Sequence, residues 1–243
     1  SDLVIEDNTA TGSGSCQGLG LFVAYGSVTV EGTTIDDNDG ACTTAVGLGV
    51  RVSTDGELLM SDSTISNNTA SSATYYDNAN WQGVGLDSSG AVGVELDNVT
   101  IEGNGGSASV YYAGTFRGAG LNIRSVPATL TDVTIQGNYF TVQSVSTSST
   151  IQGAGLYLYG DVAVELTRVD VLENTLTTKQ SGTIHGAGAV VYDMDPTVDD
   201  LLVWGNALKD STSGVYSMLG AGMMLYDAAG TWDHVWVAEN TSV

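Results

Sequence analysis

Apolar and polar side chains alternate in a short segment that recurs along the chain after each Gly-x-Gly triplet. In one copy the aliphatic positions are Leu121 and Ile123. Alternation with a period of two predicts a half-buried β-strand. Each copy contains two more such segments, represented by Val164 and Leu166 in a second strand and by Val171 in a third. The pattern therefore predicts three short strands in every repeat.

The repeats keep a fixed internal distance. Gly-x-Gly triplets begin 29 to 36 residues apart, at Gly18, Gly47, Gly83, Gly118, Gly153, Gly186 and Gly220. An asparagine follows the first glycine of each triplet by 20 or 21 residues, at Asn38, Asn68, Asn104, Asn138, Asn174, Asn206 and Asn240. The stretch from each asparagine to the next triplet varies from 9 to 15 residues, so we interpret it as a loop.

Strands this short bury their inward faces only when successive repeats stack, and stacking also pairs their backbone groups. We therefore predict an all-β fold, a right-handed, single-stranded parallel β-helix of about seven rungs. Each rung is expected to hold three short strands and a variable loop. Residues 1–243 form a single domain in this interpretation.

The glycine and asparagine positions are assigned to folding. Asparagine tolerates the left-handed backbone of a sharp turn, and stacked amides can hydrogen-bond between rungs. The glycines are expected to keep an outward face free of side chains. The triplets lack the third glycine, helix and lysine of a phosphate-binding loop.

The repeat resembles that of right-handed parallel β-helix proteins of the pectin-lyase-like superfamily. The nearest resemblance is to polymorphic outer-membrane proteins of bacteria, which pair a GGA-I motif with an F-x-x-N motif. The counterparts here are Gly118-Ala119-Gly120-Leu121 and Ile135-Gln136-Gly137-Asn138, with glycine and isoleucine departing from those motifs. The resemblance spans the whole chain and implies a secreted or surface protein, often an adhesin, or a polysaccharide lyase or hydrolase.

The charge is strongly acidic, with 28 acidic and six basic residues and a formal net charge of −22. So few basic side chains argue against a nucleic acid as the binding partner. The sequence also has no apolar run long enough for membrane insertion. The negative electrostatic field of these acidic residues is expected to repel polyanionic glycans. The acidity suits solubility or adaptation to salt and divalent cations, or else a cationic partner.

The two cysteines lie in consecutive variable segments. Stacked rungs would bring Cys16 and Cys42 close enough for a disulfide, which would place the protein outside the cytoplasm. Two buried free thiols are the alternative. We predict an extracellular or cell-surface location.

No catalytic constellation is evident in the sequence. Lyase chemistry needs clustered basic residues, but Arg51 and Arg124 are two rungs apart and both lysines lie in expected loops. Asp87 stands alone among the outward positions of the first strand. Five further aspartates gather near the turn between the second and third strands, where a solvated turn explains them: Asp97, Asp132, Asp199, Asp200 and Asp233. His185 and His234 are more than one rung apart.

Five carboxylates flank Asn8 and the equivalent Asn38 one rung later, and stacking would bring them together: Glu6, Asp7, Asp36, Asp37 and Asp39. Their repulsion would be relieved by a cation, and calcium accepts several oxygen ligands at such a turn. Simple solvation is the alternative. No cofactor is required by any motif, and calcium is the one candidate.

The outward positions of the first strand become apolar and aromatic in the last three repeats. They are Tyr157, Tyr159, Val190, Tyr192, Met224 and Tyr226. We predict that they form one flat binding face for another subunit, another domain or a sugar ring, unless loops of this chain cover it.

The chain begins and ends at the same point of the repeat, which suggests a segment of a longer solenoid or a subunit that stacks into a fibre. The function expected from these features is an extracellular structural or adhesive rod. Its partners are expected to be itself, by end-to-end or lateral association, another surface protein, or a glycan. The alternative is a carbohydrate-active enzyme, a glycoside hydrolase or polysaccharide lyase, that acts on neutral or weakly charged glycans.

Overall fold

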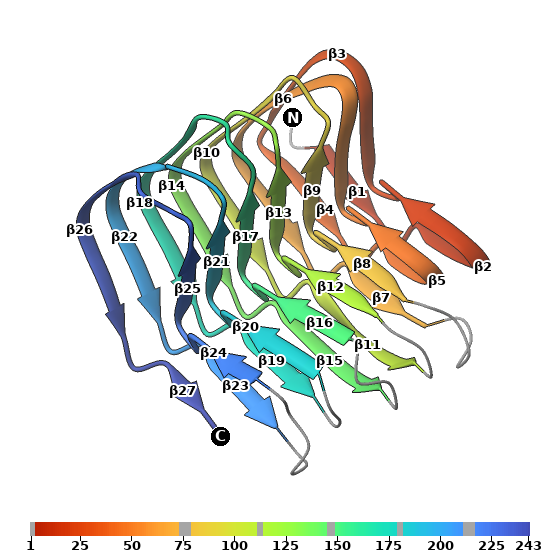
Figure 1. The fold of residues 1–243 in the computed structure, drawn as a ribbon. Coiled ribbons are helices and arrows are strands. Elements are labelled where there is room, and N and C mark those ends of the chain that lie inside the picture. The colour runs from red at the N-terminus through yellow and green to blue at the C-terminus, as the bar shows by residue number, and fades with distance from the viewer. Residues whose placement is uncertain (1–2, 73–78, 111–113, 145–148, 179–181, 211–216) are drawn as a thin grey trace.

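The computed structural model describes residues 3–72, 79–110, 114–144, 149–178, 182–210 and 217–243. All regular structure in these residues is β-strand, arranged in two large parallel sheets (Figure 1). About six turns separate the first and last Gly-x-Gly triplets. The parallel β-helix predicted from the sequence is therefore confirmed.

The first sheet has two layers. The first layer follows Gly-x-Gly and comprises β3 (Leu21–Glu31), β6 (Val50–Ser66), β9 (Leu86–Ser89), β13 (Leu121–Arg124), β17 (Leu156–Tyr159), β21 (Ala189–Tyr192) and β25 (Met223–Tyr226). The second layer comprises β1 (Leu3–Glu6), β4 (Thr33–Asp36), β10 (Gly93–Glu102), β14 (Ala128–Gln136), β18 (Val164–Leu172), β22 (Thr197–Trp204) and β26 (Thr231–Ala238). The long strands β3 and β6 continue from one layer into the other, which makes the layers one sheet.

The second sheet also has two layers. The third layer follows the asparagine and comprises β2 (Thr9–Gln17), β5 (Asp39–Val46), β7 (Thr69–Ser71), β11 (Gly105–Val110), β15 (Tyr139–Ser144), β19 (Thr175–Thr178), β23 (Ala207–Asp210) and β27 (Thr241–Ser242). The fourth layer precedes Gly-x-Gly and comprises β8 (Asn80–Gln82), β12 (Thr115–Arg117), β16 (Ser149–Gln152), β20 (Gly182–His185) and β24 (Ser217–Leu219). The segments expected to be loops thus form a sheet of their own.

The register places equivalent residues above one another. Leu121 pairs with Leu86 on one side and with Leu156 on the other, and Ile101 pairs with Ile65 and Ile135. The predicted second and third strands are continuous in the second layer, as in β10 and β14. Each aliphatic side chain consequently lies above the aliphatic side chain at the equivalent position of the preceding rung.

The interior contains two separate apolar cores. One lies between the layers of the first sheet and is aliphatic, with Leu121 and Ile135 fully buried. The other lies inside the second sheet and includes an aromatic cluster of Trp81, Phe116 and Phe140, whose ring centroids are 5.4 to 6.5 Å apart. Two lobes therefore meet at an angle and give the β-helix an L-shaped profile (Figure 1).

Glycine and asparagine form the wall between these cores. A Cβ on the second glycine of a triplet, Gly85, would lie 3.0 Å from the Asn104 amide and 2.6 Å from the carbonyl oxygen of Gly120. The first glycine, such as Gly83, has a φ of 49°, which a side chain rarely adopts. The glycines are therefore needed for close packing and for turn geometry, and not, as expected from the sequence, to keep an outward face free of side chains. The contact between the second glycine and the asparagine also fixes the number of residues between the triplet and the asparagine.

The asparagines stack as predicted. Asn104 is fully buried, and its side-chain oxygen accepts hydrogen bonds from the backbone and side-chain nitrogens of Asn68, at 3.0 and 2.8 Å. The predicted left-handed turn, however, falls on the preceding residue, for example Asp37 with a φ of 51°. Asparagine is needed at its own position because a buried amide satisfies several backbone groups at once.

The described residues contain no helix that is long and apolar enough to cross a bilayer.

Candidate functional site

An open groove of about 350 Å³ runs along the inner corner of the L, where the fourth layer meets the first. The corner is concave because Gly-x-Gly turns the chain sharply between strands such as β12 and β13. Residues from four successive rungs line the groove or hold its side chains. The lining residues are Arg117, Arg124, Thr150, Gln152, Tyr157, Tyr159 and Tyr192.

Two arginines on the fourth rung dominate the groove. Arg117 lies 5.5 Å above the ring of Tyr157, and its Nε donates a hydrogen bond to Gln152 at 3.1 Å. Arg124 lies 6.0 Å from the ring of Tyr159. Stacking on an aromatic face stabilises a guanidinium and fixes its orientation.

The floor of the corner continues toward the N-terminal rungs as a buried polar column. Asp87 is fully buried and is ion-paired with Arg51, while Asn122 also donates to this carboxylate. Burial and the positive charge of Arg124 lower the pKa of Arg51 to about 10, which leaves it charged at neutral pH. The effect of Arg124 on this pKa indicates that the charges of Arg51 and Arg124 interact.

Only some of the side chains predicted to form the aromatic face lie at the surface. Tyr157 and Val190 are 4% and 0% exposed, so they belong to the floor of the corner and not to a flat surface. Tyr159 and Tyr192 are half-buried, and Tyr226 is exposed. The prediction of six side chains on one open face is wrong for the two buried residues, because the fourth layer folds back beside them.

The remaining tyrosines stack on one another. The rings of Tyr192 and Tyr226 lie 4.5 Å apart and nearly parallel, and those of Tyr159 and Tyr192 lie 5.7 Å apart. Burial and the neighbouring hydroxyl of Tyr226 raise the pKa of Tyr192. Because ring faces are used within the stack, Tyr192 offers a ligand its edge and hydroxyl. Met224 is half-buried beside this stack on β25.

Sequence reasoning missed the fourth-layer half of the groove. Gln82, Arg117, Gln152 and His185 all stand immediately before a Gly-x-Gly triplet. That shared position was a readable signal, but the variable length of the segment concealed the strand. Consequently, Arg117 was not connected with Arg124, and the basic cluster was overlooked.

The predicted calcium residues lie at exposed turns in the first two rungs. Asp36 accepts hydrogen bonds from Ser66 and Asn67, at 2.6 and 3.0 Å, and Asp39 accepts one from Thr69. The negative charge of Asp36, together with partial desolvation and with Asp7 and Asp39, raises the pKa of Asp37.

Within the described ranges, these acids, Glu6 included, form no group of three ligand atoms within 4.8 Å of one another. Such a group occurs elsewhere, in Asp199, Asp233 and His234 at an exposed corner of the second layer. His234 Nδ1 lies 3.0 Å from Asp199, and this hydrogen bond raises the pKa of His234. Calcium at Asp36 and its neighbours stays a prediction.

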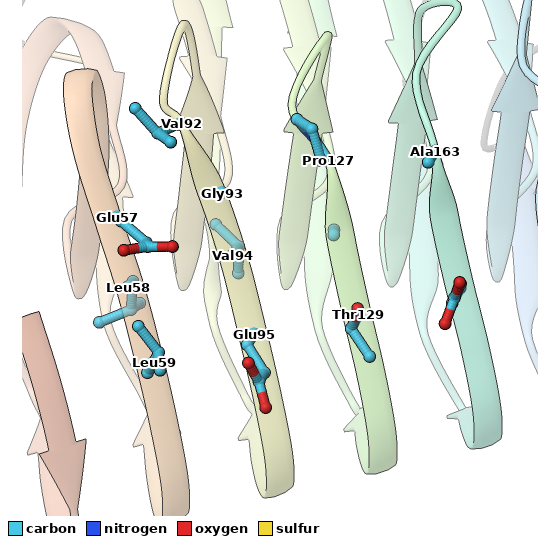
Figure 2. Close-up of a pocket in the computed structure, with 12 residues that line it drawn as sticks. Glu57, Leu58, Leu59, Val92, Gly93, Val94, Glu95, Pro127, Thr129 and Ala163 are labelled. Atoms are coloured by element: carbon cyan, nitrogen blue, oxygen red, sulfur yellow. The ribbon is translucent and has the colours of Figure 1, made fainter. Parts of the chain in front are cut away.

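A second hollow of about 270 Å³ lies on the outer face of the second layer and of β6. Figure 2 shows the carboxylates of Glu57 and Glu95 on adjacent strands, beside the small side chains of Val92 and Pro127. None of the described residues that line the hollow is basic, and Thr129 among them is exposed. This face has the character of a solvated acidic surface.

Cys16 and Cys42 are joined by a disulfide between β2 and β5, with their Cα atoms 6.0 Å apart. Both cysteines are buried in the core of the second sheet. The bond ties β2 to β5, which belong to consecutive rungs, within this core.

No family model matches this chain, and no significant match was found among curated proteins or solved structures.

Proposed function

We propose that the protein is an extracellular adhesive β-helix that binds a carbohydrate chain in the groove at the Gly-x-Gly corner. The observation that carries this proposal is the concentration of arginine, glutamine and tyrosine side chains there. Planar polar groups form directional hydrogen bonds with hydroxyl-bearing ligands, and aromatic edges add apolar contact. The proposal includes a relationship to surface β-helix proteins of the pectin-lyase-like superfamily, supported by the repeat motif.

The shape of the groove supports a linear ligand. Its side chains lie in columns that run from rung to rung, from Gln82 on β8 to Tyr192 on β21. Adjacent rungs are about 4.8 Å apart, so these four rungs span roughly 14 Å. An extended oligosaccharide lying parallel to the helix axis would meet a polar or aromatic side chain of the groove at each rung.

The same site supports binding over hydrolysis. Glycoside hydrolases use two carboxyl groups that flank the scissile bond. Among the described residues of this corner the only carboxylate is Asp87, which is fully buried and paired with Arg51 and Asn122. Carbohydrate cleavage thus has less support than carbohydrate binding.

The test is a blocking substitution within the groove. Thr150→Trp should fill the space beside Gln152 and Tyr157 and abolish oligosaccharide binding, measured on a glycan array and then by calorimetry. Thr129→Trp is the matched control, because it places the same side chain on the outer hollow. Equal binding by both variants, or no glycan bound by the wild type, would contradict the proposal.

A further inference from the structure

Among the described residues, Arg117 and Arg124 have no carboxylate partner, although the protein is rich in carboxylates. The chain has 28 acidic residues and only six basic ones. The other two arginines are ion-paired, Arg51 with Asp87 and Arg168 with Asp132. Within the described part of the chain, no acidic side chain lies within 4 Å of Arg117 or Arg124. Both unpaired charges are on the same rung and face the same groove.

Both guanidinium groups are held in place by uncharged partners. Arg124 Nη1 donates to the side-chain oxygen of Gln82 at 2.8 Å, as Arg117 Nε does to Gln152. Each also rests on a tyrosine ring. A guanidinium has five N–H groups, and each arginine uses one of them in a hydrogen bond to a side chain of the described residues, which leaves further donors for a ligand. The donors are oriented in advance, which reduces the entropy lost when a ligand binds.

The positive charges of Arg117 and Arg124 both influence the side chain of Tyr157. Burial raises the pKa of Tyr157, and both Arg117 and Arg124 oppose that rise. All three side chains line the same groove, and Arg117 lies 5.5 Å from the ring of Tyr157. Half-buried arginines that share a neighbourhood repel one another, and Arg124 likewise opposes the charge of Arg51. An anion placed between them would relieve this repulsion.

We propose that Arg117 and Arg124 bind an oxyanion substituent, a carboxylate or a sulfate, on the sugar chain that occupies the groove. This inference rests on the proposed carbohydrate binding and names the chemical class of the ligand. Guanidinium forks match the geometry of carboxylate and sulfate oxygens, and such charge-assisted bonds are about twice as strong as neutral ones.

The net charge limits how acidic the ligand is. A protein of charge −22 repels a polyanion as it approaches. At physiological salt this repulsion decays over about 8 Å, so the arginines dominate only within the groove. The ligand is accordingly a sparsely charged glycan, with one oxyanion per several sugars.

The experiment compares four forms of one oligosaccharide, selected on the array: neutral, singly carboxylated, singly sulfated and carboxylated on every sugar. Calorimetry at low salt should give at least tenfold tighter binding for a singly charged form than for the neutral form. The carboxylated and sulfated arms distinguish the two sources of the oxyanion. Arg117→Gln and Arg124→Gln should each remove most of this preference, measured as the ratio of the affinities of one variant for the charged and the neutral form.

Arg168→Gln is the matched control, because Arg168 is exposed and paired with Asp132 outside the groove. Circular dichroism verifies that each variant is folded, and one folded groove variant suffices for the comparison. Equal affinity for neutral and charged forms would overturn the oxyanion site but leave carbohydrate binding intact. Tightest binding of the fully charged form would overturn the sparse charge, and no binding of any form would overturn both proposals.

Discussion

The asparagine in each repeat is the residue that makes a thin, two-core solenoid stable. Asn104 donates to the backbone oxygens of Ile65 and Glu102, at 2.9 and 3.0 Å, and to the amide of Asn138 at 3.1 Å. It lies between the cores, where no water replaces a lost hydrogen bond. An unsatisfied buried polar group costs about 1–3 kcal/mol.

Asn104→Ala should therefore lower the free energy of unfolding by about 3 kcal/mol, because it leaves several buried partners unsatisfied. Asn98→Gly is the control, since Asn98 is exposed, donates one hydrogen bond to Asp62 at 2.6 Å, and has a φ of 53°, which glycine adopts without strain. It should cost less than about 1 kcal/mol. Denaturant unfolding measures both, and similar losses for the two variants would refute the importance of the asparagine ladder.

The two histidines report two opposite environments. Burial lowers the pKa of His185 in the groove wall, whereas the hydrogen bond to Asp199 and the charge of Asp233 raise the pKa of His234. NMR titration should resolve two imidazoles on opposite sides of the ordinary value of about 6.5. Asp199→Asn should lower the pKa of His234 alone; a shift of both histidines, or of neither, would contradict this account.

The signs for stability are also opposite. His234 contributes stability that is present below the unfolded pKa and is lost as pH rises through its higher folded pKa. His185 does the reverse, because protonation is less favourable in the folded state, so its effect destabilises the fold as pH falls below the unfolded pKa.

At the level of the elements, the disulfide joins β2 and β5 across a sequence separation of 26 residues. A closed loop of this size restricts the unfolded chain and contributes about 3 kcal/mol in the chain-entropy account. The double substitution Cys16→Ser with Cys42→Ser should lower the free energy of unfolding by about that amount. Reductant should produce a similar loss in the wild type and none in the variant. Equal stability of oxidised and reduced wild type would show that the bond constrains nothing.

The sequence predicted the elements whose spacing is constant. Leu121, Ile135 and Asn138 occupy the buried columns expected for them, because folding holds the triplet and the asparagine against each other. The fourth layer could not be predicted in the same way. Its strands, such as β12 and β16, are only three or four residues long and follow segments of changing length, so no period marks them.

For the molecule as a whole, the groove arises from the angle between two lobes, a property that no single repeat encodes. Tyr157 and Arg124 were visible as outward positions in the sequence, but their partners Arg117 and Gln82 come from the other lobe. This arrangement turns an expected flat face into a corner with a basic centre. The parts of the repeat that vary therefore form half of the candidate site.

The most direct test of this site is to follow the side-chain Nε–Hε NMR signals of the four arginines during titration with the singly charged oligosaccharide. Arginine substitutions assign each signal. We expect saturable shifts of the Arg117 and Arg124 signals with one dissociation constant, and no shift of the signal of the exposed, ion-paired Arg168. Unchanged signals of Arg117 and Arg124 while the ligand binds, or a dominant shift of Arg168, would contradict the claim that the Gly-x-Gly corner is the binding site.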